Sequence, residues 1–303
     1  METKTEHPRI KELKFTLYRI FQNPSAIIGV VLLFIFLTIA ALAPYIAPPK
    51  FEHQPYMMPH KGYSMTPQPP GEGHIFGTTS GQYDIFYGVI WGTRTAFKIG
   101  VTVVLSAFVI GAILGITAGY YGGMIDELIM RAVDVFFAVP FMILAMAFVV
   151  AFGRGLNSIM IALILVIWRR YARVMRAGVL SVRDEDYILA AKSMGVSDIR
   201  IMLRHIFPNA VYPTMVIAFM DAGSIVITAA FLSFIGLGAP IGYADWGQML
   251  AMARNYIVGP AGEPLKFWYT IFFPGLFMIL FVLAWNLFGD ALRDAFDPKL
   301  RRK

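Results

Sequence analysis

Cysteine is absent from the 303-residue chain, and charged residues make up only 15% of it. The absence of cysteine excludes disulfide scaffolds, cysteine-ligated zinc sites and cysteine nucleophiles. The low charge, combined with 57% apolar residues and a mean hydropathy of +0.63, excludes a disordered chain and most water-soluble enzymes. The composition therefore indicates a membrane protein.

The motifs of an independent enzyme are also missing. No Gly-Lys dipeptide occurs, so the chain lacks a phosphate-binding loop and is not expected to hydrolyse ATP alone. No Gly-x-Ser-x-Gly nucleophile turn occurs, and the five histidines are scattered without the spacing of metal ligands. We therefore expect no catalytic residues, no cofactor and no metal site.

Long apolar stretches are abundant instead. Six regions qualify as candidate membrane spans, namely 26–47, 99–121, 135–153, 155–168, the pair 206–220 and 222–244, and 267–289. A helix needs about 20 residues to cross the apolar core of a bilayer, so the 14-residue fourth stretch is ambiguous by length. The first stretch is too long for the core of a signal peptide and ends in prolines, so we expect it to remain as an anchor.

The placement of basic residues supports six spans with both chain ends in the cytoplasm. In that topology the cytoplasmic segments hold 19 Lys and Arg and the outer segments hold 6, which follows the positive-inside rule. Removing the fourth span would place the basic region 169–204 outside and destroy this pattern. The net charge of +7 is thus explained by topology, and we expect no nucleic-acid partner.

This topology predicts a cytoplasmic segment 1–25, a first transmembrane helix 26–47 and an extracytoplasmic loop 48–94 rich in proline and glycine. A five-helix core 95–290 and a cytoplasmic tail 291–303 follow. Within the core, the cytoplasmic loop 184–208 has the pattern of two short helices separated by Gly195. Glycine is favoured there because the residue after a helix often adopts a positive φ, and Pro208 is predicted to end the second helix. The pattern alone fits either a connector lying on lipid headgroups or a docking element for a cytoplasmic partner.

The string DEDYILAAKSMGVSDIRIMLRHIFPNA at 184–210 resembles the EAA loop of the inner-membrane permease subunits of ABC importers. In that loop a Glu-Ala-Ala triplet is followed by a glycine and a proline-containing end. The chain is similar in particular to the dipeptide/oligopeptide/nickel permease group, through FGDALRDAFDPKLR at 288–301, FLSFIGLG at 231–238, DWG at 245–247 and ARNY at 253–256. The segment 19–24 and the long outer loop fit the same group.

The resemblance implies a type I permease fold of six transmembrane helices, localised in the inner membrane. It implies transport of peptides by alternating access, with oligosaccharides or nickel as alternative cargo. The implied partners are a second homologous permease subunit, two ATP-binding subunits, an extracytoplasmic substrate-binding protein and membrane lipid. It implies that the residues at the Glu-Ala-Ala position and around the following glycine couple the permease to the ATPase. These residues are Leu189, Ala190, Ala191, Met194 and Gly195. An ion-coupled transporter, an intramembrane enzyme or a receptor-like membrane protein is the different-class alternative.

The chain departs from the family pattern at three places. Leu189 stands where the triplet usually has glutamate, and the string GTTSGQYD at 77–84 replaces a more highly charged pattern before the second span. Ala229 and Ala230 stand where an acidic residue is often found. The last two differences concern receptor docking or substrate rather than energy coupling.

A few charged residues lie within or beside the spans. Asp221 is a candidate for the substrate pathway or for gating, because a charge inside a bilayer needs a partner or water. Structural pairing or a position near the membrane surface is its alternative. Arg131 and Asp134 are three residues apart and predict an ion pair on one helix face. We expect four arginines that follow the fourth apolar stretch to lie at headgroup level rather than to contact the ATPase, namely Arg169, Arg170, Arg173 and Arg176.

The backbone pattern also predicts packing. Gly111, Gly115 and Gly119 recur at four-residue spacing, which is typical of closely approaching helices. Pro140 in the third span predicts a kink.

Overall fold

The computed structural model describes residues 24–296 of the chain, and this part is mostly helical, as predicted. Its α-helices are α2 (Pro24–Ile46), α3 (Ile85–Tyr121), α4 (Gly123–Ala138), α5 (Phe141–Phe152), α6 (Leu156–Leu180), α7 (Asp186–Ser193), α8 (Asp198–Ile201), α9 (Phe207–Ala210), α10 (Tyr212–Phe234), α11 (Trp246–Ala253) and α12 (Tyr269–Phe296). Most of the predicted segment 1–25 and the end of the tail 291–303 lie outside the described residues.

Four of the described helices are long and apolar enough to cross a membrane, namely α2, α3, α10 and α12. A fifth span results if α4 and α5 are counted together. The helix α6, at the place of the predicted fourth span, has 25 residues but carries four arginines and is not among them. Length and composition therefore account for four or five of the six predicted spans.

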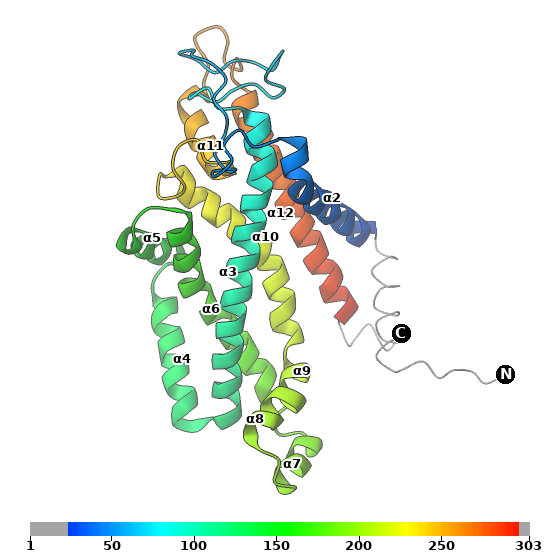
Figure 1. Cartoon of the computed structure of the whole chain (residues 1–303). Helices are drawn as coiled ribbons and strands as arrows, with labels where there is room; N and C mark the ends of the chain where they lie inside the picture. Colours follow the sequence, from blue (N-terminus) through cyan, green and yellow to red (C-terminus); the bar gives the residue numbers. More distant parts are fainter. Residues whose placement is uncertain (1–23, 297–303) are drawn as a thin grey trace, which may run out of the picture.

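The helix α3 is the longest element and extends beyond the predicted second span. It begins at Ile85 rather than near residue 99 because the Asp84 side chain caps it, accepting a hydrogen bond from the Tyr87 backbone N–H at 3.3 Å. Its 37 residues run almost the full length of the molecule (Figure 1), about 55 Å at the rise of an α-helix.

The three spaced glycines of α3 pack directly on α6. A Cβ on Gly111 would lie 2.7 Å from the carbonyl oxygen of Trp168, and one on Gly115 would lie 2.5 Å from that of Ala172. The prediction of a close helix interface is confirmed, and the partner is a helix of the same chain.

The third predicted span is sharply bent, as Pro140 predicted. The axes of α4 and α5 meet at 93° across the break that contains this proline. Proline cannot donate the backbone hydrogen bond that would continue α4 and restricts the preceding residue to extended conformations; Val139 has φ −96° and ψ 132°.

The segment between α2 and α3 contains no described helix and gathers with α11 at one end of the molecule, whereas α7 and α8 lie at the other end (Figure 1). It is tied down by hydrogen bonds such as that from the Trp91 indole to the Ala47 carbonyl at 2.9 Å. The Ala244 backbone N–H donates to the Tyr56 carbonyl at 2.8 Å, and Tyr56 stacks on Tyr243. The segment therefore forms a fixed cap over the ends of the long helices.

Candidate functional site

The loop 184–210 begins with two short helices, α7 and α8, which lie at one end of the molecule (Figure 1). Glu185 is the N-cap of α7 and Asp186 lies in its first turn, where negative charge favours the helix dipole. Gly195 has φ +74°, so the predicted left-handed position after α7 is confirmed. Because other residue types rarely adopt this conformation, Gly195 sets the angle between α7 and α8.

One face of α7 is buried and the other is exposed. Ile188 and Ala191 are buried among Met175, Val179 and Ile201. Leu189 and Met194 are 48% and 76% exposed, and Ala190 is also exposed. Of the residues assigned to coupling, Ala191 is buried, because the helix period turns it toward the same side as Ile188.

The α7–α8 unit is anchored to the end of α3. The Tyr120 hydroxyl donates to Asp198 Oδ1 at 2.6 Å, and the Lys192 ammonium lies 4.8 Å from the centre of the Tyr120 ring. Arg183 donates to the Gly119 carbonyl at 2.8 Å. These contacts couple any displacement of α7 and α8 to the long helix α3. Beside them, burial raises the pKa of the Tyr187 phenol, and the nearby Glu185 carboxylate raises it further.

The sequence predicted that the second helix of the loop ends at Pro208, and this prediction is wrong. The chain continues from α8 through a π-helical turn, Met202–Ile206, into α9, which contains Pro208 in its first turn. Proline clashes with the carbonyl four residues earlier in a regular α-helix. The wider π turn just before it relieves that constraint, so the helix passes through the proline.

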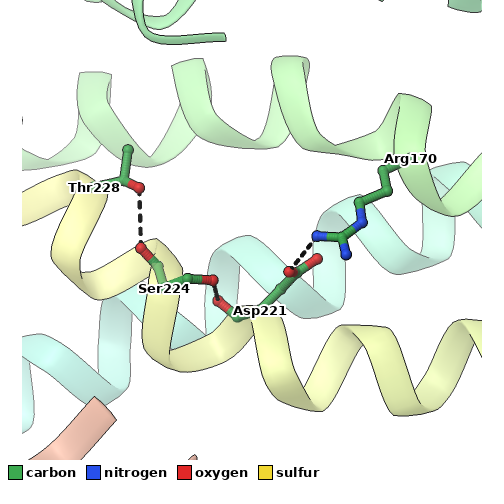
Figure 2. Close-up of polar contacts among 4 residues, drawn as sticks. All are labelled: Arg170, Asp221, Ser224 and Thr228. Atoms are coloured by element: carbon green, nitrogen blue, oxygen red, sulfur yellow. Dashed lines mark hydrogen bonds and ion pairs between the residues drawn. The ribbon is translucent and has the colours of Figure 1, made fainter. Parts of the chain in front are cut away.

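Asp221 of α10 has a partner in α6 (Figure 2). Its Oδ1 accepts a hydrogen bond from Arg170 Nη1 at 2.7 Å, so Asp221 has an ion-pair partner within the chain. The hydroxyl groups of Ser224 and Thr228 donate to backbone carbonyls one turn earlier on α10. The pair borders a cavity of about 270 Å³ between α6, α10 and the α4–α5 break.

The other arginines of α6 are also partnered, and their position relative to the lipid headgroups stays a prediction. Arg169 is 6% exposed and donates to the Phe136 carbonyl, Arg173 pairs with Asp134, and Arg176 pairs with both carboxyl oxygens of Asp126. Helix packing brings these charges from α6 against α4. Pairing satisfies charges that would be costly to bury alone.

The prediction of an ion pair between Arg131 and Asp134 is wrong. Arg131 instead lies 3.5 Å from Glu127, one turn earlier on α4, while Asp134 pairs across to α6. Sequence analysis missed these interhelical partners. The two partners of one pair lie at similar depth: Arg170 lies 14 residues from the start of α6, and Asp221 lies 13 residues from the end of α10. The predicted stretch 155–168 ended before Arg170, so this signal was not available from the sequence.

Asp245 at the opposite end of the molecule is a buried N-cap. Its Oδ1 accepts from the Gly247 backbone N–H at 3.2 Å and starts α11, and burial raises the pKa of its carboxyl group. Within residues 24–296, no three His, Asp or Glu side chains are grouped as metal ligands.

Comparisons with known proteins agree with this architecture. The family described as "Binding-protein-dependent transport system inner membrane component" matches residues 111–302. The family described as "N-terminal TM domain of oligopeptide transport permease C" matches residues 14–70. The inward-facing MetNI methionine ABC transporter has a TM-score of 0.55, with 18% identity over 70% of this chain and 98% of that chain. At this identity the likeness establishes the type I permease fold.

Sequence relatives cover nearly the whole chain. The dipeptide transport system permease protein DppC of Alkalihalophilus pseudofirmus is 37% identical, over 92% of this chain and 88% of the relative. The oligopeptide permease OppC of Bacillus subtilis is 32% identical over 95% and 90%, respectively. The glutathione permease GsiD of Pectobacterium atrosepticum is 39% identical over 81% of each. The chain therefore belongs to the multi-pass inner-membrane permease family of binding-protein-dependent ABC importers.

Proposed function

We propose that this chain is a permease subunit of an ATP-driven importer that moves di- and oligopeptides across the cytoplasmic membrane by alternating access. The names of its relatives, which transport dipeptides, oligopeptides and glutathione, support peptides as the cargo. The chain would act with a second homologous permease subunit, two ATP-binding subunits and an extracytoplasmic substrate-binding protein, embedded in lipid. It is itself non-catalytic, and ATP is hydrolysed by the partner subunits.

The proposed topology has six transmembrane helices and cytoplasmic ends, with α6 as the additional span. Its four arginines are compatible with crossing because three pair with aspartates of α4 and α10 and the fourth bonds to a backbone carbonyl. Paired charges that face other helices are the form in which a membrane tolerates arginine. This topology puts α7 and α8 in the cytoplasm, where the ATPase is.

The observation that supports the proposal most directly is that α7 has one buried face and one exposed face. Its exposed residues, Leu189, Ala190 and Met194, would contact the ATPase, and its buried residue Ala191 would pass movement to α6. Gly195 would hold α7 and α8 at a fixed angle. Since Leu189 replaces the family's usual glutamate, we expect this contact to depend on buried apolar surface rather than on a carboxylate.

Asp221 would have a role in the substrate pathway. It borders the cavity beside the α4–α5 break, and only its Oδ1 is engaged by Arg170. In alternating access one helical bundle rocks against another around the site, and we propose that this movement changes the relative position of α6 and α10. The ion pair between Arg170 and Asp221 would then stabilise one of the two arrangements of α6 and α10 more than the other.

The coupling assignment is tested with the complete complex in proteoliposomes. Met194→Asp and Leu189→Asp should abolish most peptide-stimulated ATP hydrolysis and uptake, because each places an unpaired charge in an apolar contact. Val258→Asp is the matched control: Val258 is 78% exposed, and the segment between α11 and α12 lies at the other end of the molecule (Figure 1). Normal coupling in both α7 variants would overturn the assignment.

The different-class alternative, an ion-coupled transporter, makes the opposite prediction for Gly195→Val. This variant forces a β-branched residue into a left-handed conformation and would misdirect α7. Peptide uptake that persists in the Gly195→Val variant, or in the purified chain without an ATPase, would contradict the importer. Lost ATPase stimulation with normal membrane insertion supports it.

A further inference from the structure

A second cavity, of about 740 Å³, forms where the turn between α5 and α6, the end of α10 and the end of α11 meet. These elements lie away from α7, toward the part of the molecule that carries α11 (Figure 1). Two strings that stood out in the sequence converge on it: 231–238 supplies Phe234, Gly236 and Gly238, and 253–256 supplies Arg254 and Asn255. The proposed coupling site uses neither string. We call this cavity the outer cleft.

The outer cleft is positively charged. Arg154 from the α5–α6 turn and Arg254 from the turn after α11 both line it, and none of its lining residues is Asp or Glu. Both arginines are exposed, and within residues 24–296 neither has a carboxylate partner. All four arginines of α6, by contrast, are engaged.

Neutral hydrogen-bonding groups lie between the two arginines and the helix ends. Gln248 of α11 and Asn255 line the cleft. The Gln248 side chain is buried, with 7% of its surface exposed. The Ser80 hydroxyl donates to the Met252 carbonyl at 3.0 Å and ties the capping segment to the cleft wall. The two exposed arginines are therefore the charged donors of the cleft.

We propose that the outer cleft binds the free α-carboxylate of the peptide cargo as it enters the permease. This inference rests on the proposed function and topology, which make the cargo a peptide and put the cleft on the extracytoplasmic side. Guanidinium groups present paired donors that match a carboxylate, and every unblocked peptide has one at its end. The cleft volume is in the range that holds a small organic ligand.

The test compares trialanine with its C-terminal amide in proteoliposomes that contain the complete importer and its binding protein. The affinity of the binding protein for each cargo is measured first, and both cargoes are supplied at saturation. Arg154→Gln and Arg254→Gln together should lower uptake of trialanine by about three- to tenfold, the effect of losing partly exposed charged hydrogen bonds. Uptake of the amide should remain within about twofold of the wild-type rate. Lys266→Gln is the control, because Lys266 is an outer-segment cation already paired with Glu263.

Three results would overturn the inference. One is unchanged uptake of both cargoes. Another is an equal loss for both cargoes with a raised half-saturating concentration of binding protein, which would mean that the arginines contact that protein. The third is that the double glutamine variant loses the partner permease on purification, while Arg154→Lys and Arg254→Lys lower the uptake of both cargoes equally. If the wild-type complex imports neither cargo, the proposed function fails instead.

Discussion

The close contact between α3 and α6 gives a sharp prediction for Gly115→Ala. The new Cβ would lie 2.5 Å from the Ala172 carbonyl oxygen and 2.7 Å from the Met175 Cβ. Neither atom is the end of a flexible side chain, so the two helices must separate. Since α6 is held to α4 and α10 by its arginine pairs, the displacement strains several contacts at once.

The expected magnitude follows from two opposing terms. Overpacking costs about 1–3 kcal/mol, while replacing glycine by alanine in a helix gains about 0.5–1 kcal/mol. Gly115→Ala should therefore lower the free energy of unfolding by about 1 kcal/mol, within a range of about 0 to 2.5 kcal/mol. Gly275→Ala is the matched control, because it lies in α12 with no atom within 4 Å of a new Cβ. It should be neutral or stabilising.

Thermal unfolding of the purified protein in detergent, followed by tryptophan fluorescence, measures the difference between the two variants. Gly115→Ala should unfold at a lower temperature than the wild type, and Gly275→Ala should not. If both variants behave alike, the α3–α6 contact is not as close as described and the argument fails.

Three further predictions concern the acidic residues. In a double-mutant cycle, Asp221→Asn and Arg170→Gln should show a coupling free energy of about 1–2 kcal/mol in unfolding experiments, and additive effects would refute a direct pair. Asp126→Asn should destabilise more than Asp134→Asn in the same assay, since the Asp126 side chain is 16% exposed and that of Asp134 is 57% exposed; the reverse order would contradict this. Asp245→Asn keeps an N-cap oxygen and removes a buried charge. Because burial raises the pKa of Asp245 in the folded state, wild-type stability falls as the pH rises above about 4. The melting-temperature advantage of the variant should thus widen from pH 4 to pH 7.5, and a constant difference would refute the reasoning.

Some features could be predicted from the sequence because they are local demands of the backbone. Gly195 has the positive φ that its position after a short helix predicted, and Pro140 marks a 93° bend. The spaced glycines Gly111, Gly115 and Gly119 lie in a close helix contact. In each case the residue type restricts φ or removes side-chain volume, so the consequence does not depend on distant parts of the chain.

The side-chain pairings were decided by the tertiary structure. Asp134 has an arginine on its own helix face but pairs with Arg173 of another helix. Ala191 is buried although its neighbour Ala190 is exposed. The outer cleft brings together Arg154 and Arg254, which are 100 positions apart in the sequence. Which charges meet depends on how helices are rotated and at what depth they lie, and that is fixed only when the long helices pack against one another.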